Sequence, residues 1–138
     1  MQKQFSILLF IAFFTVVSGC SDGKLKTEPV SGTITYKGAP LADATVGFTP
    51  KVAGEGNGGF ARTNEKGFYQ LQTTLGRADA GTTPGEYYVT VLKVELVGTK
   101  EDEMKSVPVI PEKYSSKTKS GLTATVTKGK NEFNFDLE

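Results

Sequence analysis

The chain contains no histidine, no tryptophan and only one cysteine among its 138 residues. Without histidine it has no imidazole, so a histidine general base and a histidine metal ligand are both excluded. A single cysteine cannot form an internal disulfide, so a hydrophobic core must hold the fold together. A chain of this length is sufficient for one domain with such a core.

The chain also lacks an excess of charge of either sign. It has 16 basic and 15 acidic residues, which gives a formal net charge of +1. Proteins that bind nucleic acid or anionic lipid headgroups through charge carry a clear excess of Lys and Arg. We therefore expect no nucleic-acid partner and no purely electrostatic attachment to a membrane.

The first residues have the pattern of a secretory leader. One positive charge, Lys3, precedes a run from residue 5 to residue 17 that is apolar except for Ser6 and Thr15. This run is shorter than the roughly 20 apolar residues that a transmembrane helix requires. It has the length of a signal-peptide core, so we predict a cleaved signal peptide at residues 1–19.

The leader ends in an aliphatic residue, two small residues and the lone cysteine: Val17, Ser18, Gly19 and Cys20. These four residues resemble the bacterial lipobox, in which the cysteine thiol receives a diacylglycerol and the preceding peptide is removed. The resemblance implies a lipidated Cys20 that anchors the protein to a membrane through acyl chains such as palmitate. The alternatives are a coincidental cysteine beside an ordinary leader and an uncleaved N-terminal membrane anchor.

The residues after Cys20 are polar and show no periodicity, so we expect a lipidated tether at 20–27 and a folded domain at 28–138. In lipobox proteins, an aspartate directly after the cysteine favours retention in the inner membrane. Here Ser21 holds that position and Asp22 follows it. The resemblance therefore implies an extracytoplasmic, lipid-anchored protein, with the outer membrane favoured if the cell has two membranes.

The rest of the chain shows period-two alternation without a helical stripe. It predicts seven strands, at residues 30–36, 44–49, 60–63, 68–73, 86–96, 122–126 and 133–137. We expect the first two to pair as one hairpin and the last two as another, and 86–96 to be a central strand. Such a series of short strands predicts an all-β fold, an antiparallel seven-stranded β-sandwich.

One detail of this sandwich stays open, and two segments interrupt the series of strands. In the fourth strand, either Tyr69 and Leu71 point inward together or a bulge intervenes after Phe68. Four glycines within residues 51–59 predict a mobile loop. Two prolines and many charges within 98–120 predict a long excursion between strands.

Four stretches carry a family resemblance: VSGTI at 30–34, GAPLADATVGF at 38–48, TNEKGFYQL at 63–71 and PGEYYVTV at 84–91. They resemble the signatures of carboxypeptidase regulatory-like domains, which are transthyretin-like sandwiches. IPEKY at 110–114 and LTATV at 122–126 resemble the small lipoproteins of planctomycete-type bacteria that carry this domain. The resemblance implies an accessory or adhesive module without a shared catalytic site. A purine-pathway hydrolase with a transthyretin-like fold depends on histidines, so that activity is excluded.

Three side-chain clusters could suggest chemistry, and a simpler explanation exists for each. The charged run at 101–103 lacks the ligand spacing of a calcium loop, so we expect a solvated loop and no metal. The glycines at 54–59 lack the Lys-Ser or Lys-Thr pair of a phosphate-binding loop. The Ser and Lys residues at 115–120 lack the helix start that a serine–lysine dyad requires. We expect no cofactor and no catalytic residue, and hence no enzyme.

These inferences predict a non-catalytic envelope lipoprotein that contacts an envelope protein or a glycan. Its contact surfaces would be the segments 36–41, 54–59 and 98–120. The alternative is a small-ligand or carbohydrate-binding carrier domain, which would require an aromatic platform or a cavity between subunits.

Overall fold

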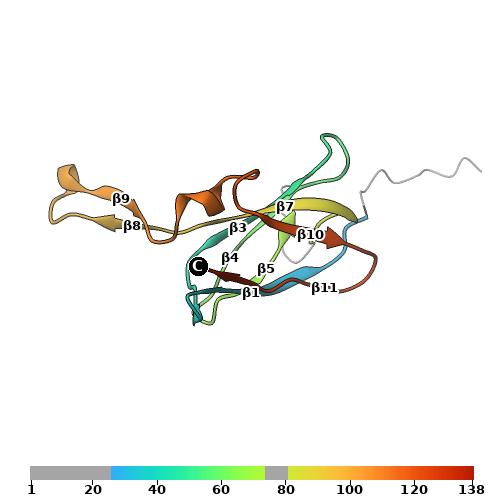
Figure 1. The fold of residues 1–138 in the computed structure, drawn as a ribbon, viewed down its shortest axis with the longest axis horizontal. Helices are drawn as coiled ribbons and strands as arrows, with labels where there is room; N and C mark the ends of the chain where they lie inside the picture. The colour runs from blue at the N-terminus through green and yellow to red at the C-terminus, as the bar shows by residue number, and fades with distance from the viewer. Residues whose placement is uncertain (1–25, 74–80) are drawn as a thin grey trace, which may run out of the picture.

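The computed structural model describes residues 26–73 and 81–138. These residues form two five-stranded sheets that pack face to face, and a separate two-stranded ribbon projects from one end (Figure 1). The predicted all-β sandwich is therefore confirmed. The number of strands was wrong, because the described residues form twelve short strands rather than seven. The predicted signal peptide, Cys20 and most of the tether lie outside the described residues.

The first sheet has β1 at its centre. Its members are β1 (Val30–Tyr36), β2 (Ala39–Pro40), β5 (Phe68–Gln70), β11 (Asn131–Glu132) and β12 (Phe135–Leu137). The second sheet runs in the order β10-β7-β3-β4-β6. Its members are β3 (Thr45–Pro50), β4 (Gly59–Arg62), β6 (Gln72–Thr73), β7 (Gly85–Leu92) and β10 (Leu122–Val126).

The core lies between the two sheets and follows the predicted alternation. In β7 the inward residues Tyr87, Val89 and Val91 are fully buried, and β7 lies centrally between β10 and β3 as predicted. Tyr69 and Leu71 both point into the core, which confirms that inward pair. The ring of Phe48 packs against three aromatic rings, those of Tyr69, Tyr87 and Phe133.

The predicted strand at 68–73 serves both sheets. β5 pairs with β1 of the first sheet, whereas β6 pairs with β4 of the second. Leu71 lies between them and is fully buried. The chain therefore crosses the edge of the core at this residue, and its side chain fills the gap between the sheets.

The predicted hairpin between the first two strands is wrong. Lys37 and Gly38 both have positive φ, 51° and 79°, which is the two-residue turn that closes tight hairpins. The turn joins β1 to the short β2, with Tyr36 opposite Ala39. β3 instead pairs with β4 and β7 in the second sheet, because the buried Leu41 carries the chain across the core.

The predicted C-terminal hairpin is also wrong, because its two strands belong to different sheets. β10 pairs with β7 in the second sheet, whereas β11 and β12 run parallel to β1 in the first. The side-chain amide of Asn131 holds the connecting turn by donating to the carbonyl oxygens of Thr127 and Gly129, each over 2.8 Å. The first sheet is therefore mixed, not purely antiparallel.

The segment after β7 differs most from the prediction. The strand predicted at 86–96 ends at Leu92, and the chain continues into β8 (Val94–Val97), which pairs with β9 (Lys105–Pro108) outside the sandwich. The turn of this ribbon contains the 3₁₀ helix η1 (Glu101–Glu103). A second 3₁₀ helix, η2 (Glu112–Ser115), returns to the body. The predicted excursion at 98–120 is thus largely ordered structure.

The two ends of β7 define the two ends of the domain. Near its start, Glu28 bridges to Thr82 as the described chain enters the fold. Beyond its end, the β8–β9 ribbon extends away from the body, on the opposite side of the molecule in Figure 1. No helix among the described residues is long and apolar enough to cross a membrane.

Candidate functional site: the β8–β9 ribbon and the groove at its base

The predicted lipidation site cannot be placed, because Val17, Ser18, Gly19 and Cys20 lie outside the described residues. The three predicted contact segments can be placed, and they lie at two different ends of the domain. The β1–β2 turn lies at the ribbon end, where the Lys93 ammonium donates to the Ala42 carbonyl oxygen over 2.7 Å. The glycine loop lies at the other end, beside Thr82 and Thr83.

The second half of the glycine loop is tied to the body. The Asn57 amide donates to the Thr83 hydroxyl over 3.1 Å, and the Thr82 hydroxyl donates to the Asn57 carbonyl oxygen. The buried Tyr87 hydroxyl joins the same network by donating to the Thr83 carbonyl oxygen over 2.7 Å. These hydrogen bonds hold the loop against the body of the domain. The bonded groups are paired with one another, which is not the arrangement of a phosphate-binding loop.

The ribbon carries most of the large apolar side chains that the described structure leaves exposed. On the ribbon and its turn they are Val94, Leu96, Val97, Met104 and Val107, of which Leu96 is the most exposed at 63%, and Leu92 at the end of β7 adjoins them. Scattered single apolar residues are normal on a protein surface, whereas a contiguous group marks an interaction site. The ribbon is therefore the strongest candidate contact surface.

The two faces of the ribbon differ in charge. Directly opposite residues of an antiparallel pair share one face. Val94 lies opposite Pro108, and Leu96 lies opposite Ser106, so this face bears no charge. Glu95 opposite Val107 and Val97 opposite Lys105 form the other face, which mixes charged and apolar side chains. We call the first one the uncharged face.

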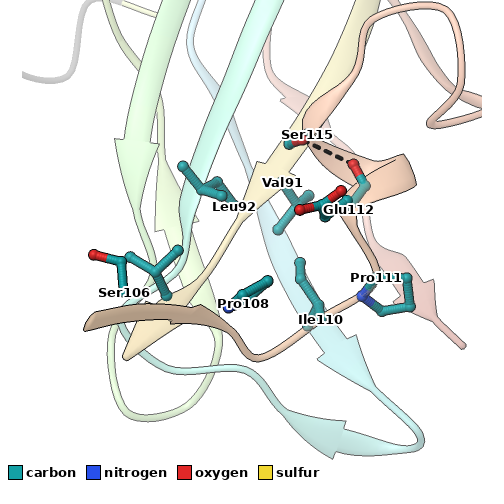
Figure 2. Close-up of a pocket in the computed structure, with 9 residues that line it drawn as sticks. Val91, Leu92, Ser106, Pro108, Ile110, Pro111, Glu112 and Ser115 are labelled. Carbon is teal, nitrogen blue, oxygen red and sulfur yellow. Dashed lines mark hydrogen bonds between the residues drawn. The ribbon is translucent and has the colours of Figure 1, made fainter. Parts of the chain in front are cut away.

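The uncharged face runs into a groove at the base of the ribbon, shown in Figure 2. The groove has a volume of about 230 Å³. One wall comes from the end of β7 and the ribbon, and the other from η2 and the residues before it. Its lining residues are Val91, Leu92, Val94, Ser106, Pro108, Ile110, Pro111, Glu112 and Ser115. A groove of this size and composition suits one apolar side chain of a partner.

The hydroxyls of Ser115 and Ser120 bond to the backbone rather than to a lysine. The Ser115 hydroxyl donates to the Glu112 carbonyl oxygen over 2.8 Å, which closes η2. The Ser120 hydroxyl donates to the Val89 carbonyl oxygen over 2.7 Å and accepts from the Leu122 amide. Both hydroxyls therefore stabilise the fold.

The acidic run lies at the tip of the ribbon. Glu101–Glu103 forms η1, and the Glu103 carboxylate accepts a hydrogen bond from the Thr99 hydroxyl over 3.3 Å. In the part of the chain that the structure describes, no three His, Cys, Asp or Glu residues are grouped so that they could hold a metal ion. The tip is an exposed acidic turn.

Among the residues that the structure describes, one titratable group is clearly perturbed, and it lies in the core rather than at the ribbon. Burial raises the pKa of the Tyr69 hydroxyl well above its usual value, and the nearby Glu132 carboxylate raises it further. The hydroxyl donates to the Phe133 carbonyl oxygen over 2.8 Å. Its role is structural, because a neutral donor is what the buried carbonyl oxygen requires.

Comparison with known proteins does not identify a family for this chain. No family model matches the chain, and no curated protein matches it significantly. A 9R-lipoxygenase from Cyanothece PCC8801 is similar over 81% of this chain and 16% of its own, with 10% identity and a TM-score of 0.44. A DUF3823 family protein from Parabacteroides merdae ATCC 43184 is similar over 83% and 47%, with 15% identity and a TM-score of 0.42. The chain spans less than half of either protein, and these likenesses assign it neither a family nor an activity.

From the sequence, residues 94–96 were predicted as the end of the strand at 86–96, and the residues of β9 fell within the long excursion predicted at 98–120. Val94 and Leu96 alternate with Lys93 and Glu95, which is a strand pattern, whereas Val107 is followed by Pro108, Val109 and Ile110. Pro108 argued against a strand. In the structure Pro108 is the last residue of β9, at the edge of a two-stranded ribbon, where its missing N–H costs nothing.

Proposed function

We propose that the chain is a lipid-anchored envelope protein whose β-sandwich is a non-catalytic module that binds another envelope protein. The proposal combines the lipobox at Val17–Cys20 with the exposed apolar ribbon at the far end of the domain. The proposal also rests on the resemblance of the sequence to the carboxypeptidase regulatory-like lipoproteins of planctomycete-type bacteria. The partner contact is the uncharged face of the ribbon and the groove at its base.

The observation that carries this proposal is the position of the ribbon relative to the chain entry. The described chain enters beside Glu28, which contacts Thr82 near the start of β7, and the ribbon continues from the opposite end of β7. A strand of eight residues spans about 26 Å at roughly 3.3 Å per residue. An anchor that precedes residue 26 would therefore hold the ribbon away from the membrane, where a partner can reach it.

The chemistry of the remaining side chains supports a non-catalytic role. The chain has no histidine. The serines at 115 and 120 bond to backbone carbonyl oxygens. The four stretches that resemble the carboxypeptidase regulatory-like family form turns and pack the core, as the buried Tyr87 and Val89 illustrate. Motif residues that only build the scaffold favour an accessory module over an enzyme.

The anchor is tested by intact mass spectrometry of the protein purified from native membranes, together with cell fractionation. We expect a diacylated or triacylated species that begins at Cys20 and is found in the membrane fraction. The Cys20→Ala variant should lose the acyl mass and leave the membrane fraction. An unlipidated or uncleaved wild-type protein would contradict the lipoprotein part of the proposal.

The partner contact is tested by affinity capture from detergent-solubilised membranes with two matched variants. Leu92 lines the groove and is 46% exposed, whereas Phe60 lies on β4 and is 47% exposed. We expect Leu92→Asp to abolish capture of the partner and Phe60→Asp to leave it unchanged. Equal capture by both variants, or no captured protein in any envelope fraction, would overturn the proposed contact.

A carbohydrate-binding role is the second candidate, and one observation favours it. Phe68 is 42% exposed on the outer face of the first sheet. It borders a shallow hollow of about 420 Å³ that also contains Gln70, Lys130 and Glu132. An exposed ring beside polar groups is a platform for a sugar. Titration of envelope glycans against wild type and Phe68→Ala tests this role, and binding that Phe68→Ala removes would support it.

A further inference from the structure

The outer edge of β8 is unpaired. In residues 26–73 and 81–138, β8 pairs only with β9. An unpaired edge exposes backbone N–H and C=O groups to any other strand. Natural proteins usually protect such an edge with charged side chains, especially lysine, or with proline or a bulge. β8 has the sequence Val-Glu-Leu-Val, which contains neither lysine nor proline and has Glu95 as its one charge.

The hydrogen-bond pattern of the ribbon identifies the backbone groups on this edge. The Val109 amide donates to the Lys93 carbonyl oxygen over 2.9 Å, so these two residues form a hydrogen-bonded pair. Hydrogen-bonded and non-hydrogen-bonded pairs alternate along an antiparallel ladder. The pairs of Val94 with Pro108 and of Leu96 with Ser106 are therefore non-hydrogen-bonded. The N–H and C=O groups of Val94 and Leu96 consequently point outward from β8.

The same pattern closes the outer edge of β9. Pro108 and Ser106 hold the outward positions on that strand. Proline has no N–H to offer, so a strand that approached β9 would lack one of its hydrogen-bond donors. The ribbon thus has one blocked edge and one open edge, and the open edge is bordered by the exposed side chains of Val94, Leu96 and Val97.

We propose that β8 pairs antiparallel with β8 of a second copy of this chain, about a two-fold axis at Leu96. A two-fold interface uses the same surface of both copies, so this pairing requires only that β8 be complementary to itself. The two Leu96 residues would exchange backbone hydrogen bonds, and Val94 would lie opposite Gly98. The four-stranded sheet would join the two uncharged faces into one wider apolar surface.

Charge selects this register. Shifting the pairing so that Val94 faces Leu96 would place Glu95 of one copy directly opposite Glu95 of the other, which is destabilising. The Leu96-centred register places Glu95 opposite Val97 instead. Because Val97 lies beside Lys105 within each ribbon, Glu95 of one copy and Lys105 of the other share a face with only Val97 between them. The net charge of +1 adds little repulsion between copies.

The size of the contact sets the expected affinity. A four-residue edge buries less than the roughly 1,200 Å² of a standard stable interface. We therefore expect a reversible dimer with a dissociation constant of about 1 µM to 1 mM. This dimer goes beyond the proposed function, because it depends neither on lipidation at Cys20 nor on capture of a different protein.

The test is sedimentation velocity of the full chain, purified from membranes in density-matched detergent, over a range of concentrations. Leu96→Pro removes an outward N–H from β8 without removing a hydrogen bond within the ribbon. Ser106→Pro makes the same change on the blocked edge and is the matched control. We expect wild type and Ser106→Pro to dimerise alike, and Leu96→Pro to raise the dissociation constant about tenfold or more. A monomeric wild type, or equal effects of the two prolines, would overturn the proposal.

A charge exchange tests the register without proline. Glu95→Lys and Lys105→Glu should each weaken dimerisation, because each places like charges on either side of Val97. The double variant should restore it. Circular dichroism of each variant verifies that the sandwich is folded. If the double variant stays as weak as the single variants, the Leu96-centred register is wrong. A photo-crosslinker at position 96 that captures only a different protein in cells would assign the edge to another partner.

Discussion

The Tyr69 hydroxyl donates to the Phe133 carbonyl oxygen over 2.8 Å, across the backbone of Gly32. Tyr69 is on β5, Phe133 lies between β11 and β12, and Gly32 is on β1, which separates them. Because the Phe133 carbonyl oxygen bonds to the tyrosine, the Asn134 side chain accepts the Thr33 amide in its place, over 2.8 Å. The hydrogen bond from Tyr69 to Phe133 therefore links β5, across β1, to the segment between β11 and β12.

Gly32→Ala should destabilise the fold strongly. A methyl group at residue 32 would overlap the Phe133 carbonyl oxygen and lie 2.9 Å from the Tyr69 hydroxyl. Overpacking of this kind costs about 1–3 kcal/mol, and a lost buried hydrogen bond adds to it. Urea unfolding followed by circular dichroism measures the loss of unfolding free energy.

Gly47→Ala is the control for this prediction. Gly47 lies on β3, and its added methyl group would meet only the Thr90 hydroxyl, at 2.8 Å. That side chain can rotate away, so the loss should be smaller than for Gly32→Ala. Equal losses for the two variants would show that alanine in a strand, and not the contact with Phe133, is the cause.

The Tyr69 hydroxyl should make the protein sensitive to alkaline pH. Burial raises the pKa of this hydroxyl in the folded protein above the value of about 10 in the unfolded chain. Above pH 10 the unfolded state loses this proton while the folded state keeps it, so the unfolding free energy falls as the pH rises. Below pH 10 the contribution is fully present.

Tyr69→Phe removes that proton and tests the pH prediction. Between pH 10 and 11 the unfolding free energy of wild type should decline more steeply than that of Tyr69→Phe. Tyr88→Phe, on the outer face of β7, controls for a general effect of tyrosine removal. Parallel pH profiles for wild type and Tyr69→Phe would exclude Tyr69 as the source of the alkaline loss.

The sequence was sufficient to predict which residues face the core but not which strands pair. Alternation identified Tyr87, Val89 and Val91 as one inward face, and the structure confirms it. Both sheets of a sandwich present the same inward alternation, so the pattern does not say to which sheet a strand belongs. The pairings predicted for β3 with β1 and for β12 with β10 failed for this reason, since in each case the predicted partner lies in the other sheet.

The candidate site was predictable only in part. The lipobox is a local motif, so Cys20 could be proposed from sequence alone, although it lies outside the described residues. The ribbon depends on tertiary context, because Pro108 excludes a central strand but not an edge strand. Only the structure shows that β8 and β9 leave the sandwich and expose Leu96.

The glycine loop offers a matched pair of variants that tests how firmly it is held. Gly54 and Gly56 both have positive φ, 84° and 95°, so alanine at either position carries a similar backbone strain of about 1–2 kcal/mol. An added methyl group at Gly54 meets nothing within 4 Å, whereas one at Gly56 would overlap the Thr83 hydroxyl and lie 3.1 Å from that of Tyr87.

Gly56→Ala should therefore lower the unfolding free energy by about 1–3 kcal/mol more than Gly54→Ala does, because it also displaces the Thr83 hydroxyl. That hydroxyl accepts the Asn57 amide over 3.1 Å. Hydrogen exchange of this amide should accelerate in Gly56→Ala and stay unchanged in Gly54→Ala. If both variants accelerate exchange equally, positive φ alone controls the loop, and the hydrogen bonds to Thr83 do not restrain it.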